Sequence, residues 1–86
     1  MQEISIKITN ATGLHARPAA TVVSEAKKFQ SSITAKKGEK EVNLKSLISL
    51  LSLGICHNEE VLIKANGIDE KEAIKQIASI INNLKD

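Results

Sequence analysis

The sequence predicts an α+β fold in two layers, with three helices on one face of a four-stranded, mainly antiparallel sheet. Four short segments alternate apolar with polar residues, as half-buried strands do, and three segments repeat apolar residues at helical spacing. Their order is β-α-β-β-α-β-α without a linker or repeat, so we expect one domain over residues 1–86. Each helical segment has one apolar face, which covers one side of a sheet and leaves the other side in water.

The first strand is predicted at residues 4–8, where Ile4, Ile6 and Ile8 alternate with polar side chains. Residues 10–13 end this strand. A helix follows over residues 16–29, because apolar residues return there at helical spacing, namely Ala16, Ala19, Ala20, Val23, Ala26 and Phe29.

A hairpin is predicted after this helix. Ile33 and Ala35 mark its first strand, and Val42 and Leu44 mark the returning strand. Residues 37–40 carry a glycine between polar residues, which is typical of the turn of a hairpin.

The second half of the chain predicts a short helix, a strand and a long helix. Residues 47–53 are rich in leucine and stop at Gly54, which favours a helix of about two turns over the alternative of a strand. Residues 61–65 alternate as a strand. Asp69 is then expected to cap a helix, and Glu70 and Glu72 follow it as candidates for the acid of a capping box. This helix has an apolar stripe of Ala73, Ile74, Ile77, Ala78, Ile81 and Leu84.

Composition argues against several classes of function. The chain carries 12 basic and 10 acidic side chains, and Phe29 is its one aromatic residue. It therefore lacks the basic excess and the stacking side chains typical of proteins that bind nucleic acid. The charge is uneven, with eight basic and four acidic residues in 1–45 but four and six in 46–86. Acidic protein partners are therefore expected near the N-terminal half.

Cysteine and histidine usage predicts neither a disulfide framework nor a metal site. Cys56 is the single cysteine, which fits a reducing compartment, and we expect it to be small and half-buried. His57 is expected to be a solvated loop residue, and no Cys or His pair has zinc spacing, so no metal or cofactor is predicted. The N-terminus lacks the pattern of a signal peptide, and the apolar stretch 47–55 is too short to cross a bilayer. We expect a cytoplasmic protein without membrane insertion.

Residues 13–20 read Gly-Leu-His-Ala-Arg-Pro-Ala-Ala and predict a phosphate site at a helix start. Pro18 fits the first turn of a helix, where its missing N–H has no partner to lose. Arg17 adds a charged fork that suits phosphate oxygens. His15 adds an imidazole, a group that is largely neutral above its reference pKa of about 6.5 and can attack phosphorus. Backbone N–H groups that lack helical acceptors would attract the anion, and we expect these from Ala16, Arg17, Ala19 and Ala20.

This octapeptide and a second motif resemble the HPr family, the histidine-containing phosphocarriers of the phosphoenolpyruvate-dependent sugar phosphotransferase system. The second motif is Val-Asn-Leu-Lys-Ser-Leu at residues 42–47, followed by Ser-Leu-Gly-Ile at residues 52–55. The resemblance covers the whole chain and implies an open-faced β-sandwich. It also implies a carrier and not an enzyme: His15 accepts a phosphoryl group on Nδ1 from enzyme I and passes it to IIA units of sugar permeases.

The resemblance further assigns roles to other residues. Arg17 and the amides around Ala16 and Pro18 would hold the phosphate. The surface that docks partners would comprise His15 and Arg17 together with Thr12, Ala20, Lys27, Leu47, Ile48 and Leu51. The apolar run at residues 47–53 fits this expectation, since a short helix cannot bury so many apolar side chains on one side.

Ser46 is a second expected site of modification. In the branch of the family that carries the Val-Asn-Leu-Lys-Ser segment, an ATP-dependent HPr serine kinase/phosphorylase modifies this serine, and a catabolite-control transcription factor reads it. Ser46 is also a predicted helix cap, and a phosphate there would add about −2 charges to the docking surface. The sequence departs from that branch at residues 47–49, which read Leu-Ile-Ser where Ile-Met-Gly is usual.

Two other functions are left open by the residues. One is a purely regulatory HPr-like module, a corepressor or inhibitor modified at Ser46 without a transport role; the presence of His15 argues against it. The other is a small nucleic-acid-binding domain, which the near-neutral charge and the lack of tryptophan and tyrosine disfavour.

Overall fold

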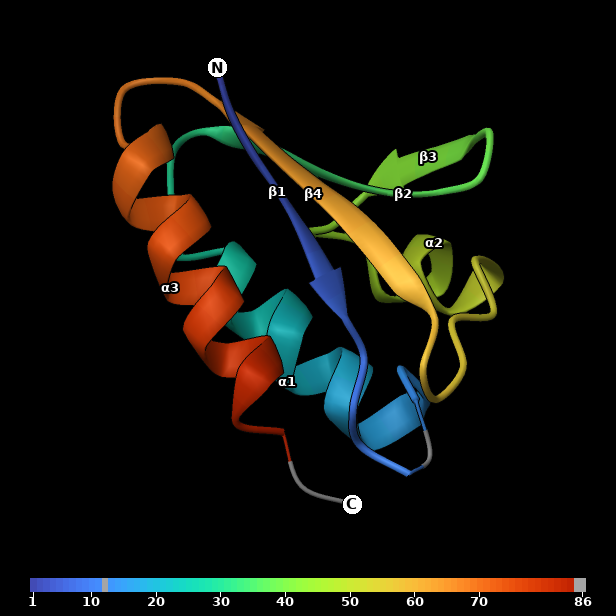
Figure 1. Cartoon of the computed structure of the whole chain (residues 1–86). Helices are drawn as coiled ribbons and strands as arrows, with labels where there is room; N and C mark the ends of the chain where they lie inside the picture. Colours follow the sequence, from blue (N-terminus) through green and yellow to red (C-terminus); the bar gives the residue numbers. More distant parts are fainter. Residues whose placement is uncertain (12, 85–86) are drawn as a thin grey trace.

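The computed structural model describes residues 1–11 and 13–84, and its elements follow the predicted order (Figure 1). They are β1 (Gln2–Lys7), α1 (Ala16–Ala26), β2 (Ser32–Lys37), β3 (Lys40–Asn43), α2 (Leu47–Ser52), β4 (Glu60–Asn66) and α3 (Glu70–Asn82). The four strands form one sheet in the order β1-β4-β2-β3, and every neighbouring pair is antiparallel. The prediction of an α+β open-faced sandwich is confirmed.

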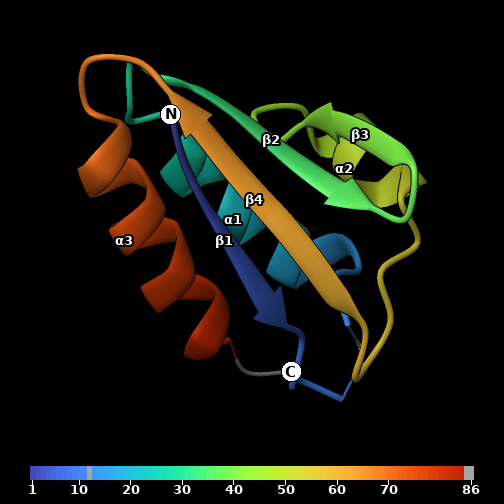
Figure 2. The same cartoon turned by 45° about the horizontal axis from the view of Figure 1, so that its top comes forward.

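The helices cover one face of this sheet. Figure 2 shows α1 behind β1 and β4 and α2 behind β3, while α3 packs against β1, β4 and α1. The face turned away from the helices is polar: the Thr34 hydroxyl donates to Glu41 at 2.8 Å, and Lys64 lies 3.7 Å from the same carboxylate. The alternation along the strands therefore separates a buried layer from a solvated one.

The core lies between the sheet and the helices. Its largest fully buried side chains come from every layer, and they are Ile8, Leu14, Ile33, Leu44, Leu50, Ile55, Ile63, Ile77, Ile81, Val22 and Val61. The apolar stripe predicted for α3 is confirmed, since its members are buried or packed against the core. The stripe predicted for α1 is partly wrong: Ala16 and Ala20 are exposed, Val22 is buried in their stead, and the helix ends at Ala26.

Asp69 lies at the N-cap position of α3, but it does not cap the helix as predicted. Its carboxylate accepts the backbone N–H groups of Gln30 and Ser31, each at 2.9 Å, and the hydroxyl of Ser31. These three bonds hold the pKa of Asp69 below its usual value. Of the two acids predicted to supply a capping box, Glu70 accepts a backbone N–H, but it does so from Gly67 at 3.1 Å and not from Asp69. Asp69 ties α3 to the loop before β2.

Two lysines of the β2–β3 hairpin fix the end of α2. Lys40 donates to the Ser52 carbonyl at 3.1 Å and Lys37 to the Gly54 carbonyl at 2.9 Å. Cations at a helix C-terminus satisfy carbonyls that have no helical partner. Gly54 has φ +60 and follows the C-cap Leu53, which confirms the predicted glycine stop. The hairpin therefore sets where this short helix lies.

None of the helices in the described residues has the length and apolar character that crossing a membrane requires.

Candidate functional site

His15 is the N-cap residue of α1, with φ −95 and ψ −170. Its carbonyl accepts the Ala19 N–H at 2.8 Å, which closes the first helical bond. Its side chain makes no capping bond and is exposed. The backbone of His15 is therefore fixed by the helix start, while its imidazole is exposed to solvent.

Two backbone amides beside His15 point away from any helical acceptor. Ala16 and Arg17 are the first two residues of α1, and Pro18 at the third position has no N–H. The prediction that Ala19 would also offer a free N–H is wrong, because that group donates to the His15 carbonyl. Ala20 lies one residue further into the helix, so the same correction applies to it. The candidate anion site therefore has fewer free backbone N–H groups than predicted, and they belong to Ala16 and Arg17.

Arg17 is exposed and borders a hollow between the start of α1 and the end of α3. Pro18, Ile80 and Leu84 are the apolar residues of this hollow, while Thr21, Ser79 and Asn83 are its polar ones. Among the described residues, no carboxylate forms an ion pair with Arg17. Its guanidinium is therefore available to an anion beside His15.

The turn before His15 is built on glycine and asparagine. The buried Asn10 donates from Nδ2 to the Gly13 carbonyl at 2.6 Å, and the Gly13 N–H donates back to the Asn10 carbonyl at 3.1 Å. Gly13 has φ +67, and a Cβ at this position would lie 2.5 Å from the Ile55 carbonyl oxygen. Leu14 then donates to that same carbonyl at 3.0 Å. Only glycine permits this close approach of the two backbones.

Ser46 caps α2 as predicted: its side-chain oxygen accepts the Ser49 N–H at 3.3 Å. The helix packs against α1 and buries Leu50, but it leaves three large apolar side chains on the surface. Ile48 is 84% exposed, and Leu47 and Leu51 are 36% and 37% exposed. We call these three residues the α2 patch.

The other predicted docking residues lie on or next to α1. Ala20 is exposed in the second turn of the helix, and Lys27 is exposed at its C-cap, at the far end from His15. The predicted contact residue Thr12 lies outside the described residues. The structure thus places Ala20 on α1 and Lys27 at its C-cap, and α1 is the helix against which α2 packs.

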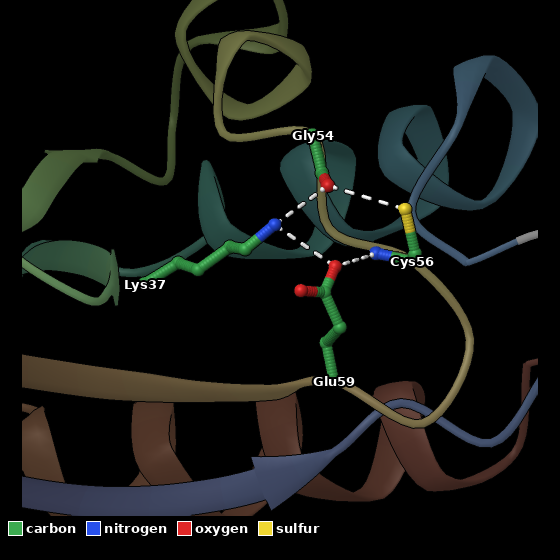
Figure 3. Close-up of polar contacts among 4 residues, drawn as sticks. All are labelled: Lys37, Gly54, Cys56 and Glu59. Carbon is green, nitrogen blue, oxygen red and sulfur yellow. Dashed lines mark hydrogen bonds and ion pairs between the residues drawn. The ribbon is translucent and has the colours of Figure 1, made fainter.

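A cluster of four residues joins β2, α2 and the turn before β4 (Figure 3). The Lys37 ammonium lies 2.9 Å from both the Gly54 carbonyl and Glu59 Oε1, and that carboxylate also accepts the Cys56 N–H at 2.6 Å. The bond from Lys37, followed by that from Cys56, holds the pKa of Glu59 below its usual value. Cys56 is exposed, contrary to the prediction of a half-buried side chain, and its thiol donates to Gly54 at 3.4 Å.

His57 is the one histidine besides His15, and it contacts the turn before His15. Its Nδ1 lies 3.1 Å from the Asn10 carbonyl oxygen. His57 is exposed in a turn, as predicted, but the contact with Asn10 was not predicted, because 47 residues separate the partners and no sequence pattern indicates it. No group of three His, Cys, Asp or Glu side chains suited to a metal occurs in the described part of the chain.

Comparison with known proteins adds the decisive observation. The family model described as "PTS HPr component phosphorylation site" matches residues 2–83. The chain belongs to the HPr family of phosphocarriers. Within this family, it is 47% identical over 85 residues to phosphocarrier protein HPr of Buchnera aphidicola, an alignment that covers 99% of this chain and 100% of that one.

Solved HPr-type structures share the fold. HPr-C-His from Thermoanaerobacter tengcongensis superposes with a TM-score of 0.93 at 48% identity, over 95% of this chain and 92% of that chain. Crh of Bacillus subtilis, described as a catabolite repression HPr, superposes with a TM-score of 0.77 at 39% identity, over 95% of this chain and 92% of that chain. The HPr family therefore includes both phosphocarriers of the phosphotransferase system and a relative named for catabolite repression.

Proposed function

We propose that this chain carries a phosphoryl group on His15 between enzyme I and the IIA units of sugar permeases, in the cytoplasm. The observation that carries the proposal is what one helix start brings together: an exposed imidazole that makes no capping bond, two amides without a helical acceptor, and a guanidinium that pairs with no carboxylate of the described residues. Membership of the HPr family supports it independently.

The transfer needs positioning and charge stabilisation more than covalent chemistry from the protein. The Nδ1 lone pair of neutral His15 attacks phosphorus as the bond to the donor histidine of enzyme I breaks. The Arg17 guanidinium and the amides of Ala16 and Arg17 then stabilise the negative charge on the phosphoryl oxygens. In the second step a IIA histidine attacks the same phosphorus, and His15 leaves as a neutral imidazole.

The α2 patch fits a role in docking both partners. It presents Leu47, Ile48 and Leu51 to solvent from a helix that packs against α1. Exposed apolar side chains gathered on one helix mark a surface for protein contacts. In this proposal the chain is a substrate of its partners and has no turnover of its own.

The test of this proposal is incubation with phosphoenolpyruvate and purified enzyme I. The expected product is one acid-labile phosphate per chain, absent in His15→Ala and retained in His57→Asn. Failure to label the wild-type chain, or undiminished labelling of His15→Ala, would overturn the proposal.

A second role, regulation through Ser46, is favoured by the place of its hydroxyl. Ser46 begins the helix that carries the α2 patch, so a phosphate on it would put about −2 charges at the edge of the docking surface. Acidic partners would then bind more weakly. An HPr serine kinase/phosphorylase would add the phosphate, and a catabolite-control transcription factor would read it.

The regulatory role is tested with ATP and the serine kinase. An acid-stable phosphate on the wild-type chain, lost in Ser46→Ala, is expected. A purely regulatory module would accept this phosphate and fail to accept the acid-labile one from enzyme I. The pair of labelling experiments therefore separates the carrier from the regulatory alternative.

A further inference from the structure

We propose that His57 is a positioning residue for His15, acting through a hydrogen bond to the carbonyl of Asn10. The inference rests on the proposed function, since it concerns how that function's reacting imidazole is held. The two histidines lie on different segments: His15 is the N-cap of α1, whereas His57 lies in the turn between α2 and β4.

The contact between His57 and Asn10 has a defined direction. Nδ1 of His57 is 3.1 Å from the Asn10 carbonyl oxygen. A backbone carbonyl only accepts hydrogen bonds, so Nδ1 must carry the proton and donate. This bond selects one tautomer of the neutral ring, with the proton on Nδ1 and the lone pair on Nε2.

Among the described residues, the Asn10 carbonyl accepts two hydrogen bonds in the turn that leads to His15. It accepts the Gly13 N–H at 3.1 Å as well as His57, while the Asn10 side chain donates to the Gly13 carbonyl at 2.6 Å. Asn10 is buried, at 7% exposure. A bond that fixes Asn10 therefore also fixes Gly13, two residues before His15.

The backbone around His57 is rigid enough to act as an anchor. Asn58 donates to the Ile8 carbonyl at 2.7 Å, and Ile8 donates to the Glu59 carbonyl at 2.9 Å. Asn58 adopts φ +70, a left-handed conformation that is uncommon outside glycine and that asparagine tolerates. The two residues that follow His57 are thus bonded to Ile8, directly after β1, and the His57 side chain adds a bond to the turn itself.

We expect the His57–Asn10 bond to affect the position of the His15 imidazole and not the stability of the whole fold. The core under the turn is held by buried Leu14 and Ile55, neither of which needs His57. Loss of the His57 bond would leave the fold intact but let Asn10 and Gly13 move relative to α1. Phosphoryl transfer is sensitive to such displacements, because the attacking nitrogen must lie in line with the leaving group.

The test compares His57→Leu with His57→Asn in phosphoryl transfer from enzyme I. Leucine has a similar branched shape but no donor, whereas the asparagine amide can place an N–H where Nδ1 lies. We expect His57→Leu to lower kcat for transfer about tenfold without changing KM for the carrier, as expected for misplacement of a reacting group. His57→Asn should restore most of the rate. Gln76→Leu, an exposed position on α3, is the matched control and should transfer at the wild-type rate.

A wild-type kcat in His57→Leu, or an equal loss in His57→Leu and His57→Asn, would overturn the inference. A measurement on the unaltered chain does not depend on how the variants fold: nitrogen-15 NMR at neutral pH should show the proton of His57 on Nδ1. A ring protonated on Nε2 alone would also overturn it. Labelling that persists in His15→Ala would instead contradict the proposed function, so the two failures are distinguishable.

Discussion

The N–H of Leu14 donates to the carbonyl of Ile55 at 3.0 Å, which bonds the residue before His15 to the segment that follows α2. Ile55 comes directly after Gly54, whose carbonyl is held by Lys37. Helices α1 and α2 are therefore linked by a backbone hydrogen bond between their flanking residues as well as by packing against each other. In the proposed function, a partner docked on the α2 patch would therefore meet His15 next to a segment that is bonded to the end of α2.

Gly13→Ala should destabilise the protein by about 2 kcal/mol or more, because it combines a left-handed φ with a steric clash. The added Cβ would lie 2.5 Å from the Ile55 oxygen and 2.8 Å from Cys56 Cα. Urea unfolding measures the loss. Gly38→Ala is the matched control, since Gly38 has φ +62 but nothing within 4 Å of the new methyl group. If the two variants lost the same free energy of unfolding, the contact of the new methyl group with Ile55 would not contribute to the destabilisation.

Arg17→Gln should slow phosphoryl transfer to His15 about a hundredfold, because a charged donor to the phosphoryl oxygens is lost. Arg17→Lys should fall between Arg17→Gln and the wild type, since an ammonium keeps the charge without the fork. Rapid-quench kinetics with phosphorylated enzyme I measure the rates. Thermal stability should be unchanged, because Arg17 is exposed. Lys75→Gln on α3 is the control for lost positive charge, and a similar slowing there would argue for general electrostatics over a specific contact.

Ser46→Ala should cost about 1 kcal/mol of folding stability, the usual value of an N-cap hydroxyl. Ser46→Asp should retain the stability, since a carboxylate also caps, but it should weaken binding of acidic partners. Denaturant unfolding and titration calorimetry with enzyme I measure the two effects. Ser24→Ala, at an exposed position within α1, serves as the control. Unchanged affinity in Ser46→Asp would count against regulation by charge at this site.

Asp69→Asn should destabilise the protein at neutral pH and progressively less in acid. The bonds from Ser31 and Gln30 lower the pKa of Asp69 in the folded state below its ordinary value of 3.8. A lowered pKa means that the stabilisation is complete above the unfolded-state value and is lost as the pH falls through the folded-state value. The stability gap between wild type and variant should therefore close below pH 4. Glu39→Gln, an exposed hairpin residue, should show no such closing gap in urea unfolding across pH.

The order of elements could be predicted because it depends on local periodicity. Alternation marked the strands, and the positions of Pro18, Ser46 and Gly54 marked helix ends, each through a preference that acts within a few residues. The octapeptide around His15 likewise marked the start of α1 through consecutive residues. These are the features for which sequence and structure agree.

The long-range contacts could not be predicted in the same way. Asp69 has the sequence context of a helix cap, yet it bonds residues 38 and 39 positions away, because folding brings the loop before β2 to the start of α3. His57 and Asn10 are 47 residues apart, and Lys37 and Glu59 are 22 apart. Periodicity also placed Ala20 in the core, although it is exposed on α1.

Transfer of phosphate onward from His15 tests the carrier role most directly. The chain is labelled with radioactive phosphoenolpyruvate and enzyme I, separated from enzyme I, and mixed with a purified IIA domain. The proposal predicts that the label leaves the chain and appears on IIA, with the chain recovered unphosphorylated and able to accept phosphate again. Label that stays on the chain, or that is released to water without reaching IIA, would contradict it.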